Sequence, residues 1–156
     1  MPATVNDAPV FQDTRHGRVY RDAEEMVNDY LARFGQVVGV QLHPLDPQGY
    51  TEVTRGSATV GINVLTDHGV LVFLSRIMDI PDPAPDDLFR HLLELNFLAT
   101  SDAAFAIDRE RGAIYLRALR RLTGLDYEEF EDLLHTVATV ADEWDDRLAQ
   151  LYPSAP

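Results

Sequence analysis

Apolar residues begin to recur at helical spacing from Asp22 onward. Asp22 and Glu25 have the spacing of a capping box, and Gly35 is a typical stop signal for a helix. The apolar side chains between these signals share one helical face, namely Ala23, Met26, Val27, Tyr30, Leu31 and Phe34. The pattern therefore predicts a first amphipathic helix of about three turns that ends at Gly35.

Runs rich in valine, isoleucine and phenylalanine follow and predict β-strands. These runs are 37–42, 57–65 and 70–78, and a further short run lies at 50–54. The joint that ends in Gly69 favours a hairpin between the last two runs, because glycine adopts a positive φ without steric cost. We therefore expect three antiparallel strands, or four as the alternative.

The proline-rich stretch DIPDPAPDD precedes a second helix, LFRHLLELNF, at 88–97. Its apolar side chains span an arc of about 200°, twice the ordinary width of a buried stripe. One sheet face cannot cover an arc this wide. Asn96 lies within the arc, where an unpaired buried amide costs about 1–3 kcal/mol. We expect Asn96 to cap backbone near the helix end or, alternatively, to fix the register of a helix interface.

Two further alternating runs, 103–107 and 113–119, flank a turn that closes on Gly112, so the pattern predicts a second hairpin at the edge of the sheet. Asp126 and Glu129 then form a capping box for a last amphipathic helix. The fold class that we predict is α+β, an α-β-β-β-α-β-β-α sandwich with an antiparallel sheet. We place it in a single domain over 21–152, preceded by an N-terminal tail over 1–20, which has no steady period.

Composition narrows the range of partners. The chain has 156 residues, no cysteine, and 13 basic residues that are all arginine, against 26 acidic ones, for a net charge of −13. This charge repels nucleic acid and anionic membranes, and we expect neither as a partner. The amino terminus has no signal-peptide pattern and no apolar run approaches the ~20 residues of a membrane span. We expect a cytoplasmic protein.

Groups for catalysis are scarce. No two of the five histidines have the spacing of metal ligands on a helix, and neither G-x-S-x-G nor a phosphate-binding loop occurs. The stretch DIPDPAPDD lacks the glycine and the glutamate of a calcium-binding loop. We therefore expect no catalytic residue, no cofactor and no metal. Five arginines lie close together, at 109, 111, 117, 120 and 121. They are solvated or paired with acidic helices or, alternatively, they bind an acidic stretch of a protein partner.

Three segments resemble the bacterial superfamily of type III secretion chaperones (CesT-like) and YbjN. They are LLELN at 92–96, FAIDRERGAIYLRALRRL at 105–122 and LTGLDYEEFEDLL at 122–134. The resemblance covers about residues 22–150. It implies the α+β order given above and a homodimer that binds polypeptide segments without turning over a substrate. In such chaperones a partner segment wraps over apolar patches and sheet edges.

From this resemblance and the wide apolar arc we expect a peptide or protein client and a homodimer, with a dimer interface at Phe89, Leu93 and Phe97. Exposed apolar surface is expected on the strands at 58–65 and 70–77. The alternative is a YbjN-like regulatory adaptor that binds a partner through Arg117, Arg120 and Arg121. A third hypothesis, an enzyme or small-ligand binder, requires a deep pocket that brings His91 or His135 to an acidic residue. Analogy of fold does not select among clients.

Overall fold

The computed structural model describes residues 8–154. Its elements, in chain order, are β1 (Phe11–Asp13), β2 (Arg18–Tyr20), α1 (Ala23–Val38), β3 (Tyr50–Arg55), β4 (Ala58–Leu65), β5 (Val70–Asp79), α2 (Leu88–Leu98), β6 (Ala104–Asp108), β7 (Ala113–Arg121) and α3 (Tyr127–Leu151). A short 3-10 turn, Thr66–His68, joins β4 to β5. After the hairpin β1–β2, this order confirms the predicted α+β fold class.

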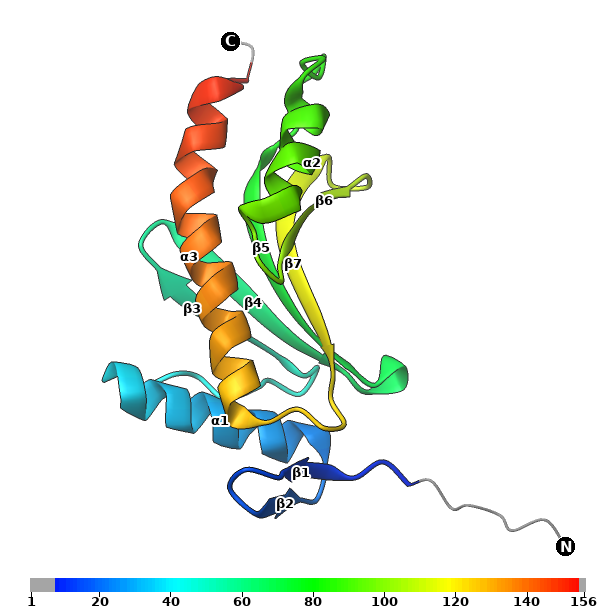
Figure 1. Ribbon diagram of the computed structural model, residues 1–156, viewed down its shortest axis with the longest axis vertical. Helices are drawn as coiled ribbons and strands as arrows, with labels where there is room; N and C mark the ends of the chain where they lie inside the picture. The colour runs from blue at the N-terminus through cyan, green and yellow to red at the C-terminus, as the bar shows by residue number, and fades with distance from the viewer. Residues whose placement is uncertain (1–7, 155–156) are drawn as a thin grey trace, which may run out of the picture.

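The main sheet has the strand order β3-β4-β5-β7-β6, and every neighbouring pair is antiparallel. The long helix α3 lies across one face of this sheet (Figure 1). The strands alternate accordingly: Leu71, Phe73 and Ile77 of β5 are buried beneath the helices, whereas Leu74 and Arg76 are exposed. One face of the sheet therefore belongs to the core, and within residues 8–154 no helix covers the other face.

Aromatic packing forms the centre of the core. The ring of Phe130 on α3 lies 5.6 Å from the rings of both Phe73 on β5 and Tyr30 on α1. All three side chains are fully buried. The predicted capping boxes hold both helices in place, since Asp22 accepts from the N–H of Glu25 and Asp126 from the N–H of Glu129.

The predicted strand over 37–42 is wrong. Helix α1 continues through Gly35 to Val38 and ends at Gly39, which has a φ of 73°. The N–H of Val40 then bonds the carbonyl oxygen of Gly35 at 2.9 Å, and a Cβ on Gly35 would stand 2.5 Å from the oxygen of Val40. Gly35 therefore does not end the helix. Its lack of a side chain lets the chain fold back closely over the helix at Val40. The third strand is instead the short run near 50–54, which forms β3.

The N-terminal hairpin β1–β2 lies within the segment that we predicted as a tail. Its strands pair Phe11 with Tyr20, and each has only three residues, which is too short to produce a recognisable alternation. Arg18 and Tyr20 hold the hairpin on α1, because both bond the carboxylate of Asp29, at 3.0 and 2.6 Å. Residues 1–7 of the predicted tail lie outside the described residues.

No helix within residues 8–154 is long and apolar enough to cross a lipid bilayer.

Tyr30 offers a test of how α1 and α3 are held together. Its hydroxyl donates to the carbonyl oxygen of Leu125 at 2.6 Å, just before α3 begins. Tyr30→Phe keeps the ring packing but leaves this buried carbonyl unpaired, so we expect the free energy of unfolding to fall by about 1–2 kcal/mol in urea denaturation. The matched control Tyr115→Phe, on the uncovered sheet face, should change it by less than about 0.5 kcal/mol. Equal losses in the two variants would contradict this account.

Candidate functional site

The edge of the sheet at β3 offers unpaired backbone groups. In an antiparallel pair, opposed residues alternate between exchanging both backbone hydrogen bonds and exchanging none. Because the N–H of Val64 bonds the carbonyl of Gly49 at 2.8 Å, the register points the backbone groups of Tyr50, Glu52 and Thr54 away from β4. Asp46 bonds both backbone groups of Tyr50, because its carboxylate accepts from the N–H and its own N–H donates to the carbonyl oxygen. Those of Glu52 and Thr54 have no hydrogen-bond partner within residues 8–154.

The opposite edge, at β6, is occupied at Phe105. The side-chain amide of Asn96 on α2 accepts from the N–H of Phe105 at 2.8 Å and donates to the carbonyl of the same residue at 3.3 Å. The expectation that Asn96 caps backbone near the helix end is therefore wrong, because its amide bonds the backbone of β6 instead. The amide takes the position that a neighbouring strand would fill at Phe105.

A groove of about 560 Å³ lies beside the free edge of β3. It is bounded by α1, by the irregular segment 40–43, by β3 and by α3. Its apolar floor and wall consist of Phe34, Val38, Val40, Leu42, Val53, Leu134 and Ala138. Phe34, Val53, Leu134 and Ala138 are buried and Leu42 is half-buried, whereas Val38 and Val40 are exposed at the rim. An apolar hollow next to unpaired backbone is a surface suited to an extended peptide.

Two basic side chains stand at one end of this groove. A guanidinium nitrogen of Arg55 lies 3.4 and 3.5 Å from the two ring nitrogens of His135, so the guanidinium lies against the imidazole. His135 therefore meets a cation rather than the carboxylate that the enzyme hypothesis requires. His91 lies elsewhere, with its ring 3.0 Å from the hydroxyl of Tyr152, which is itself 3.4 Å from the carboxylate of Asp87. These residues share a second hollow of about 380 Å³ with Glu94.

The structure gives α2 a buried side and an exposed side. Leu88 and Leu92 join the core, while Phe89, Leu93 and Phe97, the predicted dimer residues, are exposed at 37%, 70% and 83%. Leu98, which the sequence analysis did not single out, is exposed at 83%. Leu98 lies on a different side of the helix, about 100° beyond Phe97. We call Phe89, Leu93 and Phe97 the α2 patch. The wide apolar arc in the sequence indicated this exposed apolar surface.

The three arginines that we grouped as a partner surface do not share one face. Arg117 and Arg121 are exposed on the uncovered side of β7, but Arg120 points to the helix side, because successive strand residues alternate. There Arg120 pairs with Glu129 of α3 at 3.0 Å and with Asp102 at 3.5 Å. Leu74, Val72 and Leu119 lie beside Arg117 and Arg121 on the uncovered face.

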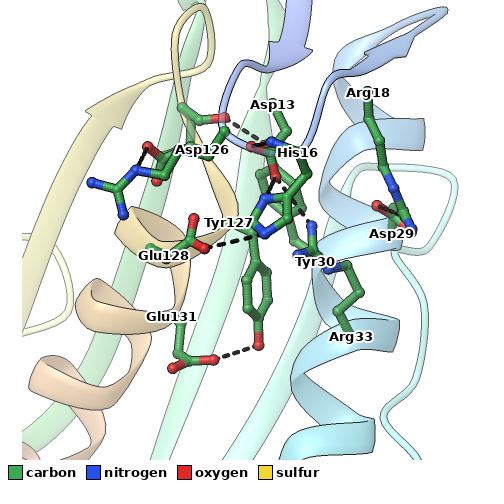
Figure 2. A network of polar contacts seen from close by, with 12 residues as sticks. Asp13, His16, Arg18, Asp29, Tyr30, Arg33, Asp126, Tyr127, Glu128 and Glu131 are labelled. Carbon is green, nitrogen blue, oxygen red and sulfur yellow. Dashed lines mark hydrogen bonds and ion pairs between the residues drawn. The ribbon is translucent and has the colours of Figure 1, made fainter.

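A polar network joins the N-terminal hairpin to α1 and α3 (Figure 2). The fully buried carboxylate of Asp13 accepts from His16 at 2.9 Å and from Arg33 at 3.1 Å. The other ring nitrogen of His16 lies 3.3 Å from the carboxylate of Glu128. Asp13, His16 and Glu128 have the composition of a metal site, but the guanidinium of Arg33 already neutralises Asp13. The network is suited to clamping the hairpin in place.

The network makes stability depend on pH. Burial by itself raises the pKa of Asp13, but hydrogen bonds from Arg33 and His16 outweigh it and hold the pKa below its ordinary value. A carboxyl with a lowered folded-state pKa stabilises the fold above its unfolded pKa, and this stabilisation is lost as the pH falls through the folded pKa. We expect Asp13→Asn to lower the free energy of unfolding by about 2 kcal/mol at pH 7, with a smaller difference below pH ~4.

The control for this prediction is Asp67→Asn, which changes an exposed aspartate in the turn between β4 and β5. Guanidinium-induced unfolding of both variants and the parent protein, measured from pH 3 to pH 8, is the relevant experiment. A difference between Asp13→Asn and the parent that stays constant over this range would show that the charge of Asp13 is irrelevant.

Comparison with known families defines the class of protein to which this fold and groove belong. The model of the Tir chaperone protein (CesT) family matches residues 29–145, which is more than half of the chain. The chain belongs to the Tir chaperone protein (CesT) family. This membership confirms the predicted family and a chaperone-like, protein-binding function. A search of curated proteins finds no match.

Solved structures of similar fold agree with the family. A chain of the ExsC–ExsE complex is 26% identical, with a TM-score of 0.66 over 81% of this chain and 96% of that chain. A chain of the heterodimeric ExoU–SpcU complex from the type III secretion system of Pseudomonas aeruginosa is 21% identical, with a TM-score of 0.58 over 82% and 98%. YbjN from E. coli reaches a TM-score of only 0.47 at 11% identity, over 76% and 91%, and gives the adaptor hypothesis no support.

Proposed function

We propose that this protein binds an extended segment of a client protein as an added strand at the edge of β3. The observation that carries the proposal is the pair of unpaired residues, Glu52 and Thr54, beside an apolar groove. Strand addition takes its affinity from main-chain hydrogen bonds and its specificity from pockets for alternate side chains, and this edge offers both. Binding without chemistry on the client is sufficient for this role.

Exposed apolar residues near the groove support the same function. Val38 and Val40 are exposed where α1 ends and line the groove beside the free edge. Natural proteins cover or charge an exposed sheet edge because it otherwise pairs with other chains. A client strand would cover this edge and these valines together. The two related complexes, ExsC–ExsE and ExoU–SpcU, each hold a second protein, which supports a protein client.

The α2 patch is proposed as the contact with a second copy of the chain. Phe89, Leu93 and Phe97 project from one side of α2 while Leu88 and Leu92 anchor its other side in the core. A two-fold axis beside α2 would set the patch against itself, which is the arrangement of an isologous dimer. We also propose that residues 21–152 form the functional domain and that it acts in the cytoplasm. The family match at 29–145 lies inside this domain.

The adaptor alternative rests on the uncovered sheet face. Arg117 and Arg121 lie there without a carboxylate within 4.0 Å among the described residues, flanked by Leu74 and Leu119. Such a surface fits a folded partner with an acidic, partly apolar face. Arg120 does not contribute to this surface, since it pairs with Glu129 and Asp102.

A proline at position 54 tests strand addition directly. The N–H of Thr54 points away from β4, so Thr54→Pro removes an edge donor without removing a bond inside the sheet. We expect this variant, used as tagged bait in lysate of its own host, to lose at least about 90% of the captured client, because one lost backbone bond and the ring together block pairing. Mass spectrometry and quantitative blotting measure the loss.

Thr54→Ala is the matched control and should capture the client like the parent protein. Circular dichroism of both variants checks that the fold is kept. The double variant Arg117→Glu, Arg121→Glu tests the adaptor alternative in the same capture. If this double variant loses the client and Thr54→Pro retains it, the uncovered sheet face is the binding surface and strand addition is wrong.

The dimer proposal predicts a change of mass in solution. Leu93→Asp and Phe97→Asp each place a charge in the middle of the α2 patch, and burying an unpaired charge costs several kcal/mol. We expect the parent protein to elute as a dimer and both variants as monomers in size-exclusion chromatography with light scattering. Val19→Asp, at an exposed valine of the N-terminal hairpin, should leave the dimer intact. A parent protein that is monomeric at high concentration would refute the proposal.

A further inference from the structure

Most arginines of this acidic chain lie beside a carboxylate. Within residues 8–154, nine of the 13 arginines lie within 4.0 Å of a carboxylate oxygen. The four that do not are Arg55, Arg109, Arg117 and Arg121. Arg109 lies in the turn between β6 and β7, and Arg117 and Arg121 lie on the uncovered sheet face. Arg55 alone of these four lines the groove beside the free edge.

The acidic side chains around the groove are directed elsewhere. Glu52 lines the groove, but its carboxylate accepts from the hydroxyl of Tyr50 at 2.8 Å. On α3, Glu131 bonds the hydroxyl of Tyr127 and Asp142 accepts from the N–H of Ser57 at 2.9 Å. Each carboxylate therefore has a partner of its own, and the guanidinium of Arg55 remains available beside an apolar floor.

His135 fixes where that positive charge lies. The imidazole belongs to α3, and both of its ring nitrogens lie within 3.5 Å of one guanidinium nitrogen, Nη1, of Arg55. This contact uses one terminal nitrogen of the guanidinium, and the N–H donors of the other nitrogens match the two oxygens of a carboxylate. The ring thus positions the arginine and leaves it able to bind an acid.

The geometry points to a client segment that carries a carboxylate two residues away from an apolar residue, with the carboxylate on Arg55 and the apolar side chain over Val53. This inference rests on the proposed strand addition at β3. Val53 and Arg55 are two residues apart and therefore face the same side of the strand. A strand added beside β3 repeats this spacing, so its own residues over Val53 and Arg55 are two apart as well.

The pairing of these residues would be close. Val53 and Arg55 direct their backbone groups toward β4, so on the open side they would oppose client residues without exchanging backbone hydrogen bonds. Side chains approach each other most closely at such positions. A lysine or arginine in place of the client's acid would meet the guanidinium at the same short range. Arg55 therefore selects for an acid and also rejects a base.

Selection from a library of displayed random peptides tests the inference. The immobilised baits are the parent protein, Arg55→Glu and Arg109→Glu, the last being a matched control because Arg109 also lacks a carboxylate partner but lies in a distant turn. From the parent protein and the control we expect peptides with an apolar residue and, two positions away, aspartate or glutamate. From Arg55→Glu we expect this acid to disappear or to be replaced by lysine or arginine.

One selected peptide is then synthesised with its acid and with the corresponding amide. By fluorescence anisotropy, the amide should bind the parent protein about fivefold more weakly, the scale of a partly exposed charge pair. Arg55→Glu should show no preference for the acid. His135→Ala should reduce the preference without reversing it, because it frees the guanidinium to move but keeps the charge.

Thr54→Pro separates failure of this inference from failure of the proposed function. Peptides that bind through Thr54 but show no acid preference, or the same preference in Arg55→Glu, overturn only the role of Arg55. A selection without any peptide that depends on Thr54 overturns strand addition and this inference together. Strand addition of a client and this inference are also overturned together if no peptide binds and Thr54→Pro dissociates an oligomer of the parent protein. A second copy of the chain would then occupy the groove.

Discussion

The packing of α3 against one face of the sheet is the constraint on which the remaining features depend. Phe130 fills the space between Phe73 of the central strand and Tyr30 of α1, and this contact fixes three elements at once. The buried faces of all three helices lie on that side, so the sheet keeps one bare face and two edges. Where α1, α3 and β3 meet imperfectly, an apolar groove remains.

The path of the chain after α1 explains why this groove is not filled from within. Gly35 and Gly39 let the chain turn back sharply, and segment 40–45 then runs toward β3 without pairing along it. A single bond from the hydroxyl of Thr51 to the carbonyl of His43, together with the bonds between Asp46 and Tyr50, closes the start of β3. The far half of the strand stays open, and it is there that Arg55 stands against His135.

The sequence predicted the parts of the fold that depend on long, regular patterns. Both capping boxes, the two-sided arc of α2 and the hairpin around Gly112 were readable because spacing alone determines them. The prediction of a strand at 37–42 was wrong, because valines near a glycine are compatible with a helix end as well as with a strand. The groove was beyond prediction, because it joins residues such as Phe34, Val53 and His135 that only tertiary packing brings together. The split of Arg120 from Arg117 and Arg121 was foreseeable from strand alternation.

The amide of Asn96 has a consequence for how far assembly can proceed. A sheet with two open edges can add copies of itself without limit and grow into a fibre. Here β3 of one molecule cannot pair with β6 of another at Phe105, because the amide of Asn96 already bonds the backbone of that residue. The contact opposes head-to-tail stacking of sheets at this point and favours a discrete particle over a fibre.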